Sequence, residues 1–250
     1  MADIQNFRSG VYNGRVLLQQ NGNVGGSRQV FVKLQGGAKN ELVFPTFGCR
    51  LLNPFKGYGK FYAGDLVEYR MDGTGYILKT FKVVSSSSTT VNIARDGYSH
   101  IPMVGDILMV APNTATGTGT GVTVSAVTTG TVTVSSKAVP VWVVTTSAAT
   151  SAAANSILVE ADKAGEGAKP LVANPNMVLP WDLDCIFNPA STANQGDPTN
   201  DTDFENARYL FDPIVEAVMY ENKMQPLPEY CKAINSSRVA GWFAINALAK

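Results

Sequence analysis

The stretch "GTGTGVTVSAVTTGTVTVSS", residues 117–136, alternates valine with threonine or serine and contains no charged side chain. Lys137 is the only charged residue from Ile107 to Val159, although charged residues make up 16% of the whole chain. An alternation with a period of two, carried by β-branched residues, predicts a β-meander. Strand edges without charges readily pair with other strands. We therefore interpret this stretch as an assembly surface between subunits, and a threonine-rich sandwich that happens to lack charges is the alternative.

Composition narrows the class of protein. The chain has 250 residues, 45% of them hydrophobic, with 20 Lys and Arg against 20 Asp and Glu. A chain without net charge is not drawn to nucleic acid or to an anionic membrane, and it tolerates close packing against partners. The first ten residues carry no secretory pattern, and no run of 18 apolar residues occurs. We expect neither export by the usual signal nor a membrane span.

The cysteines indicate the compartment in which the chain is made. Cys49, Cys185 and Cys231 are odd in number and far apart in the sequence. This spacing favours reduced, buried thiols of a cytoplasmic protein over a disulfide framework.

We divide the chain into four segments. Residues 1–48 are rich in glycine and asparagine, with short apolar pieces, and predict an extended docking arm with one or two hairpins. Residues 49–112 predict a small β-barrel-like domain. Residues 113–160 combine the uncharged β-meander with a linker. Residues 161–250 predict proline-rich coil with a helical segment, so the expected fold is mainly β: a small barrel or sandwich with a meander, an arm and short C-terminal helices.

Two local patterns define the second segment. "FYAGDLVEYR" and "YILKTFKVV" alternate on either side of Asp72-Gly73, which predicts a hairpin. The sequences Gly64-Asp65-Leu66-Val67 and Gly105-Asp106-Ile107-Leu108 repeat one device, in which a turn Gly-Asp opens an apolar strand.

The predicted helix lies within residues 202–224. Thr202 and Glu205 have the spacing of a capping box, and Asp212-Pro213 predicts a break followed by a second helix start.

Residue types that carry catalysis or bind metals are scarce in useful patterns. His100 is the only histidine, which excludes two-histidine zinc sites, and we interpret it as a surface or packing residue. The glycines of residues 117–121 resemble a dinucleotide loop, but a Val-Thr strand follows where that loop needs a helix. The oxygen-rich residues 197–205 do not fit the EF-hand template, and a helix cap explains them better. We expect no enzyme activity, no metal and no cofactor.

One cluster combines basic and aromatic side chains. Lys56, Lys60 and Arg70 lie among five aromatic residues between positions 55 and 69. Such a mixture can stack single-stranded nucleic acid, but in a neutral chain a packing face with charges at its rim is the better interpretation.

The arrangement of a Gly-Asn-rich arm, a small barrel marked "FKGYGKFYAGDLVEYR" and "MVGDILMVAPN", an uncharged Val-Thr meander and a proline-rich end resembles a known class. It is similar to the auxiliary capsid and head-fibre proteins of crAss-like and related tailed bacteriophages. The resemblance covers about two thirds of the chain and rests on architecture, without a diagnostic motif. It implies a non-enzymatic virion protein made in the bacterial cytoplasm, homo-oligomeric and attached to the major capsid protein or another virion protein by its arm. The chain is short for a far-reaching fibre, which favours a short spike or a decoration protein.

The resemblance and the patterns assign roles to named residues. For capsid contact we expect Phe7, Tyr12, Val16, Leu17 and Leu18, and for the subunit interface Val122, Val124, Val132 and Val134. The alternative function is a receptor- or glycan-binding β module of a virion or cell surface. It would use the exposed aromatic residues Tyr58, Tyr62, Tyr98 and Trp181 as candidate ligand contacts.

Overall fold

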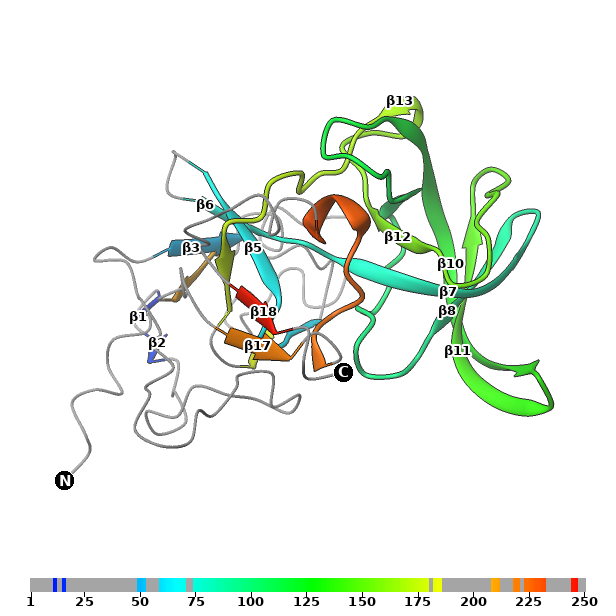
Figure 1. The fold of residues 1–250 in the computed structure, drawn as a ribbon, viewed down its shortest axis with the longest axis horizontal. Helices are drawn as coiled ribbons and strands as arrows, with labels where there is room; N and C mark the ends of the chain where they lie inside the picture. Colours follow the sequence, from blue (N-terminus) through cyan, green and yellow to red (C-terminus); the bar gives the residue numbers. More distant parts are fainter. Residues whose placement is uncertain are drawn as a thin grey trace, which may run out of the picture. The chain divides into compact units, whose positions relative to one another are not determined.

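The structure is a computed structural model that describes residues 11–12, 15–16, 49–52, 59–70, 74–179, 182–185, 208–211, 218–220, 223–232 and 244–246. The chain forms two compact units (Figure 1). Unit 1 comprises Met1–Ile77, Pro175–Met224 and Arg238–Lys250, and unit 2 comprises Leu78–Asn174 and Gln225–Ser237. Unit 2 therefore joins residues from three of the four predicted segments.

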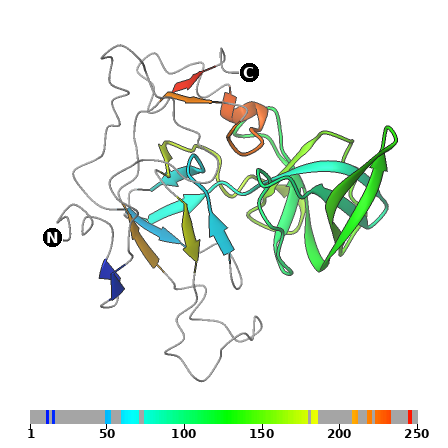
Figure 2. The same ribbon diagram turned by 90° about the horizontal axis from the view of Figure 1, so that it is seen from below.

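Unit 2 is an antiparallel sheet whose pairings close on themselves. Its strands are β7 (Thr80–Ser87), β8 (Thr90–Ala94), β9 (Ile107–Val110), β10 (Gly119–Val134), β11 (Lys137–Thr146), β12 (Ile157–Glu160) and β13 (Gly165–Ala168). The order is β11-β8-β7-β12-β9-β10-β13, and a further pairing of β10 with β11 completes a circuit of six strands. Figure 2 shows these strands, cyan to yellow-green, curving round toward one another. A closed circuit leaves its strands without free edges along the paired length.

The interior of the circuit is filled by aliphatic residues and one aromatic residue, Phe81. The core cluster contains Phe81, Val83, Val91, Ile93, Leu108, Val124, Val144, Ala152 and Leu158. These residues come from every strand of the circuit, because successive side chains of a strand point to opposite faces and only one face turns inward. Each of the larger aliphatic side chains contributes about 1.5–3 kcal/mol by its burial.

The glycines of the opening stretch belong to this sheet. Gly119 and Gly121 lie in β10 and pair with β13, opposite Ala168 and Gly165. A Cβ atom on Gly121 would collide with the carbonyl oxygen of Lys163. Close approach of another backbone therefore accounts for this glycine, and the strand expected after residues 117–121 is confirmed.

The Gly-Asp device before β9 is a four-residue turn. The amide of Asp106 donates to the carbonyl of Met103 over 3.1 Å, and Gly105 has a φ of +89°. Type II turns need such a positive φ at their third residue. The carboxylate of Asp106 accepts from the amide of Met103 at 2.9 Å, and two backbone hydrogen bonds of 2.8 Å join the turn to Val124. The turn is thus held by its own aspartate and by β10.

The same device recurs in unit 1 before β5 (Leu66–Tyr69). The amide of Asp65 donates to the carbonyl of Tyr62 at 2.9 Å, Gly64 has a φ of +85°, and the Asp65 carboxylate accepts from the Tyr62 amide at 2.8 Å. Two backbone hydrogen bonds again join the turn to a neighbour, here Leu179. The prediction that a turn Gly-Asp opens each of these strands is confirmed.

Unit 1 contains a five-stranded sheet of order β14-β5-β6-β3-β16. The further strands in it are β3 (Cys49–Leu52), β6 (Thr74–Ile77), β14 (Met177–Val178) and β16 (Arg208–Phe211). The predicted hairpin around Asp72-Gly73 is confirmed in its strands, since β5 and β6 pair antiparallel with Val67 opposite Ile77.

Three two-stranded pairings complete unit 1. They join β1 (Val11–Tyr12) to β2 (Arg15–Val16), β4 (Gly59–Phe61) to β15 (Leu183–Cys185), and β17 (Val218–Tyr220) to β18 (Ala244–Asn246). The first of these pairs is a two-stranded hairpin within residues 1–48, the segment predicted as an arm, and the other residues of that segment lie outside the described ones.

The helix predicted over residues 202–224 is wrong in its described part. Arg208–Phe211 forms β16, which pairs with β3 from Arg208↔Leu52 to Phe211↔Cys49, and Val218–Tyr220 forms β17. Pairing with a distant strand overrides the local helix signals here. The helical pattern is also short, because the predicted break at Asp212-Pro213 ends it about ten residues after Thr202.

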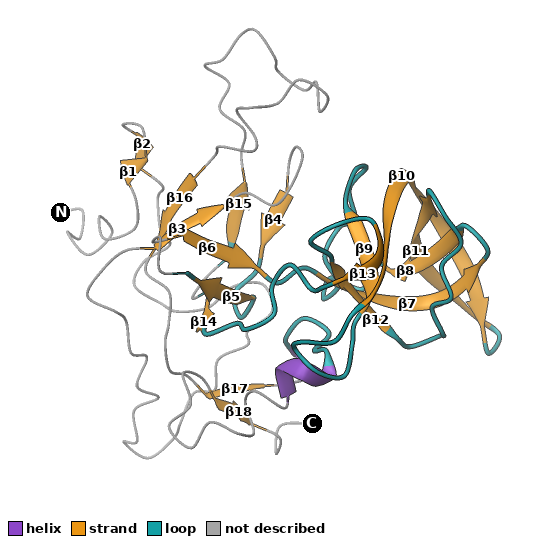
Figure 3. Ribbon diagram, turned by 90° about the horizontal axis from the view of Figure 1, so that it is seen from above, coloured by secondary structure: helices purple, strands orange, loops and turns teal. Residues whose placement is uncertain are grey.

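Helix is confined to residues 229–232 in the part of the chain that the structure describes (Figure 3, purple). Among those same residues, no helix has the length and apolar character needed to cross a membrane. The prediction of a mainly β chain is confirmed.

Replacing Gly105 tests the turn before β9. We expect Gly105→Ala to lower the free energy of unfolding by about 1–2 kcal/mol, because an L-residue with a Cβ atom is strained at this positive φ. Gly105→Asn should cost less, since asparagine tolerates left-handed backbone better. Urea unfolding of both variants measures the difference, and equal losses for alanine and asparagine would contradict the role of the backbone angle.

Candidate functional site

The outer ends of β10 and β11 form a two-stranded ribbon, which we define as residues 131–140. Within it Thr131 pairs with Pro140 and Val134 with Lys137. Strand β8 pairs with β11 only from Val141 onward, and β9 and β13 pair with β10 only up to residue 123. Along the ribbon no third strand of the described residues pairs with it. Figure 1 shows this green ribbon extending away from the other strands of unit 2.

The ribbon is open to solvent and almost uncharged. Its residues are exposed apart from Val132 and Val139, which are half-buried, and Lys137 is its only charge. Val134 is 41% exposed, which makes it one of three large exposed apolar residues in the described chain. Lysine and proline usually prevent pairing at strand edges. The β11 edge of the ribbon carries both, as Lys137 and Pro140, whereas the β10 edge, residues 131–134, carries neither.

The ribbon ends in a turn of two serines. Ser135 and Ser136 have φ values of 48° and 64°. A two-residue hairpin turn with positive φ at both positions matches the right-handed twist of the strands, but it usually carries asparagine and glycine. Serine is strained in this conformation, by roughly 1–2 kcal/mol for each residue.

The four predicted interface valines divide into two groups. Val122 and Val124 are 3% and 1% exposed and pack in the core of unit 2. A second chain cannot reach them while the circuit is closed, because alternation within β10 points them inward. Val132 and Val134 lie in the ribbon, so the interface prediction narrows to these two.

Of the predicted capsid contacts, the structure describes only the backbone at two positions. Tyr12 lies in β1 opposite Arg15, and Val16 lies in β2 opposite Val11. Phe7, Leu17 and Leu18 lie outside the described residues.

The candidate ligand-binding aromatics are only partly described, and those that are lie in different units. Tyr62 is half-buried in the turn before β5, and Tyr98 is half-buried in the loop after β8. Tyr58 and Trp181 lie outside the described residues. Tyr62 belongs to unit 1 and Tyr98 to unit 2, so the two do not lie in one unit.

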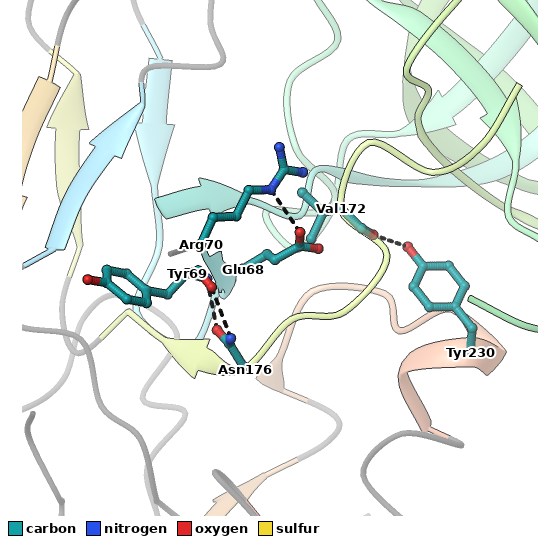
Figure 4. A network of polar contacts seen from close by, with 6 residues as sticks. All are labelled: Glu68, Tyr69, Arg70, Val172, Asn176 and Tyr230. Carbon is teal, nitrogen blue, oxygen red and sulfur yellow. Dashed lines mark hydrogen bonds and ion pairs between the residues drawn. The ribbon is translucent and has the colours of Figure 1, made fainter. Parts of the chain in front are cut away.

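Arg70 of the predicted basic and aromatic cluster contacts its own strand (Figure 4). Its Nε lies 2.9 Å from Oε1 of Glu68, and its guanidinium lies 3.8 Å from the ring centre of Tyr76. Nearby, the side-chain amide of Asn176 accepts from the Tyr69 amide at 2.8 Å and donates to its carbonyl at 3.1 Å. These contacts agree with a packing face whose charge sits at the rim. The side chains of Lys56 and Lys60 are not described.

A second candidate, which the sequence did not reveal, is a buried charged cluster in unit 2. Its members are Lys79, Asp106 and Glu160. The Nζ atom of Lys79 lies 2.8 Å from Oδ1 of Asp106 and 3.5 Å from Oε1 of Glu160. The side chains of Lys79 and Asp106 are 0% and 1% exposed. Lysine and aspartate are rarely buried to this extent without a counter-charge.

Strand order brings the three residues together. Lys79 immediately precedes β7, Glu160 ends β12, and Asp106 immediately precedes β9. Since β12 lies between β7 and β9 and runs antiparallel to both, these three strand ends meet at one rim of the sheet. The register agrees, with Val159 opposite Thr80.

The two carboxylates keep Lys79 charged. Burial lowers the pKa of Lys79, but the negative charges of Asp106 and Glu160 and their hydrogen bonds outweigh it, and the pKa is raised above its ordinary value. These two carboxylates account for a protonated amine in the interior.

Other polar groups surround the start of β7. His100 is fully buried, its Nδ1 accepts from the amide of Thr80 at 3.1 Å, and its own amide donates to the Thr80 carbonyl at 3.0 Å. Gln225 donates to the carbonyl of Leu78 at 2.8 Å. His100 is therefore a packing residue, as expected. Its hydrogen bonds to Thr80 fix the first residue of β7, next to Lys79. Among the described side chains, no three of His, Cys, Asp or Glu gather as metal ligands.

The short helix is anchored in the same unit. The hydroxyl of Tyr230 donates to the carbonyl of Val172 at 2.9 Å (Figure 4). Cys231 beside it is a buried free thiol, and burial raises its pKa. A thiol with a raised pKa is a poor nucleophile, so the interpretation of Cys231 as a small buried hydrophobic residue is confirmed.

No match to the chain was found among known protein families, curated proteins or solved structures.

Removing the amine tests the buried charged cluster. We expect Lys79→Met to lower the free energy of unfolding by about 3–5 kcal/mol, because the carboxylates remain buried without their counter-charge. The matched control is Lys82→Met, an exposed lysine of β7, which should change stability by at most about 0.5 kcal/mol. Urea unfolding followed by tryptophan fluorescence measures both, and similar values for the two variants would contradict the prediction.

Proposed function

We propose that the chain is a non-enzymatic structural protein of a tailed-phage virion, a capsid-attached decoration or head-fibre subunit. In this proposal residues 1–48 dock on the major capsid protein or another virion protein. The closed circuit of unit 2 serves as a small β-barrel, and copies of the chain assemble through the ribbon, residues 131–140. The virion role rests on the resemblance described above.

The projecting ribbon is the observation that supports assembly. Its β11 edge carries Lys137 and Pro140, and the Pro140 carbonyl accepts from the Arg95 amide at 3.1 Å. Its β10 edge, residues 131–134, is uncharged, includes the exposed Val134 and has no second strand partner in the described chain. Addition of a strand to such an edge gains main-chain hydrogen bonds and buries the alternate side chains. A second copy suits this edge, because an uncharged edge repels no identical edge and antiparallel pairing of two copies obeys twofold symmetry.

Placing a charge on the ribbon tests this proposal. We expect Val134→Lys to weaken self-association on the order of tenfold or more, since about 1.4 kcal/mol lost per interface corresponds to tenfold in affinity. Light scattering of the purified chain over a range of concentrations measures the mass. The matched control is Val104→Lys, at a residue that is 53% exposed in the turn before β9.

The same measurement on a chain without residues 1–48 separates the two roles. We expect its oligomer to persist, because assembly resides in unit 2, while its incorporation into virions is lost. A monomer in both the full and the shortened chain would overturn the assembly role and favour the receptor- or glycan-binding alternative. Equal effects of Val134→Lys and Val104→Lys would remove the ribbon from the interface.

A further inference from the structure

The buried charged cluster holds an amine against a carboxyl group in a dry environment. Lys79 Nζ and Asp106 Oδ1 lie 2.8 Å apart, and both side chains are excluded from solvent. Burial disfavours charged groups in general, although the two carboxylates keep the Lys79 amine protonated at rest. One proton passed along the hydrogen bond converts the ion pair into a neutral amine and a carboxylic acid, and a neutral lysine amine is a nucleophile.

Both partners are fixed in position. Asp106 is held by the turn from Met103, whose amide donates to Oδ2 at 2.9 Å, so that Oδ1 faces Lys79. Lys79 lies between two residues that are held by hydrogen bonds. The Thr80 amide donates to His100, and Gln225 donates to the Leu78 carbonyl. Groups preorganised in this way react with effective concentrations far above those in solution.

Glu160 lies in position to carry a proton between the amine of Lys79 and the carboxyl group of Asp106. Its Oε1 lies 3.5 Å from Lys79 Nζ, and it ends β12, the strand between those that carry the amine and the acid. Its side chain is 16% exposed, whereas the other two are closed to solvent. A carboxylate in this place can accept a proton from nitrogen and return it to a leaving oxygen.

We propose that Lys79 and Asp106 condense within the folded chain to an amide, an intramolecular isopeptide bond, with Glu160 as the proton relay. The amine nitrogen attacks the side-chain carboxyl carbon of protonated Asp106. Glu160 takes a proton from the nitrogen and delivers it to the departing hydroxyl. The C–N bond forms, the C–O bond breaks, one water leaves, and no oxidant, reductant or further reactant takes part.

The raised pKa of Lys79 is compatible with this step. The two carboxylates keep the proton of Lys79 within the buried charged cluster. The reaction needs a proton there, because the departing hydroxyl takes it up and leaves as water. The bond would tie the start of β7 to the start of β9 across β12, which closes the chain from residue 79 to residue 106 into a covalent loop. Such a link constrains the unfolded chain in the way that a disulfide does. The inference concerns one chain alone and stands whether or not the proposed function holds.

Mass spectrometry of the denatured full-length protein tests the proposal. We expect the intact mass to be lower than the sequence mass by one water molecule. A tryptic digest should contain one branched peptide that joins the segments around Lys79 and Asp106. An intact mass equal to the sequence mass, in fresh protein and after days at neutral pH, would overturn it and leave an ordinary buried ion pair. A water lost at any other site would overturn it as well.

Three variants identify the participants. Lys79→Met should show its full sequence mass, and Glu160→Gln, which keeps the shape of the relay, should form the bond much more slowly or not at all. The matched control Lys82→Met, on the exposed side of β7, should retain the deficit. The wild-type mass and peptide decide the question even where a variant fails to fold, and a deficit that persists in Lys79→Met would overturn the assignment.

Discussion

The contact of Lys79 with Asp106 and Glu160 is the interaction on which unit 2 depends most. It joins the starts of β7 and β9 and the end of β12, three strands that are neighbours in the sheet but distant in the sequence. A buried amine without these carboxylates would cost several kcal/mol, which restricts the unit to arrangements that bring all three together. The contact therefore favours the strand order in which these three strand ends meet.

The two carboxylates also mark the limits of the uncharged stretch. Asp106 is the last acid before it and Glu160 the first after it, so the chain leaves the buried charged cluster, forms β9, β10, β11 and β12 with one charge, and returns to the cluster. The inner part of that stretch fills the core, as with Val124 and Val144, and needs no charge for that reason. The exposed part includes the ribbon, whose one charge is Lys137, and parts of the loops 113–118 and 147–155. Burial therefore explains the lack of charge in the inner part, and the proposed assembly role concerns the exposed ribbon alone.

Local patterns predicted the elements whose signals lie within a few residues. The Gly-Asp turns before β5 and β9 follow from a glycine that needs a positive φ and an aspartate that bonds its own turn, and the β5–β6 hairpin follows from alternation. Prediction failed for residues 208–211, where helix caps competed with pairing to β3. It also missed Lys79, because a lysine in an alternating strand is usually an exposed residue, and its two acids are 27 and 81 positions away.

The sequence by itself determined that the chain is mainly β, where several strands begin, and that it lacks charge over a long central stretch. These properties are encoded in period, turn residues and composition, which act over a few neighbours. Only the tertiary structure decided which valines of β10 face the core and which extend into the ribbon, and that Lys79 meets two distant carboxylates. Side-chain direction and long-range pairing depend on register and strand order, and the free energy that selects them comes from burial of the whole sheet.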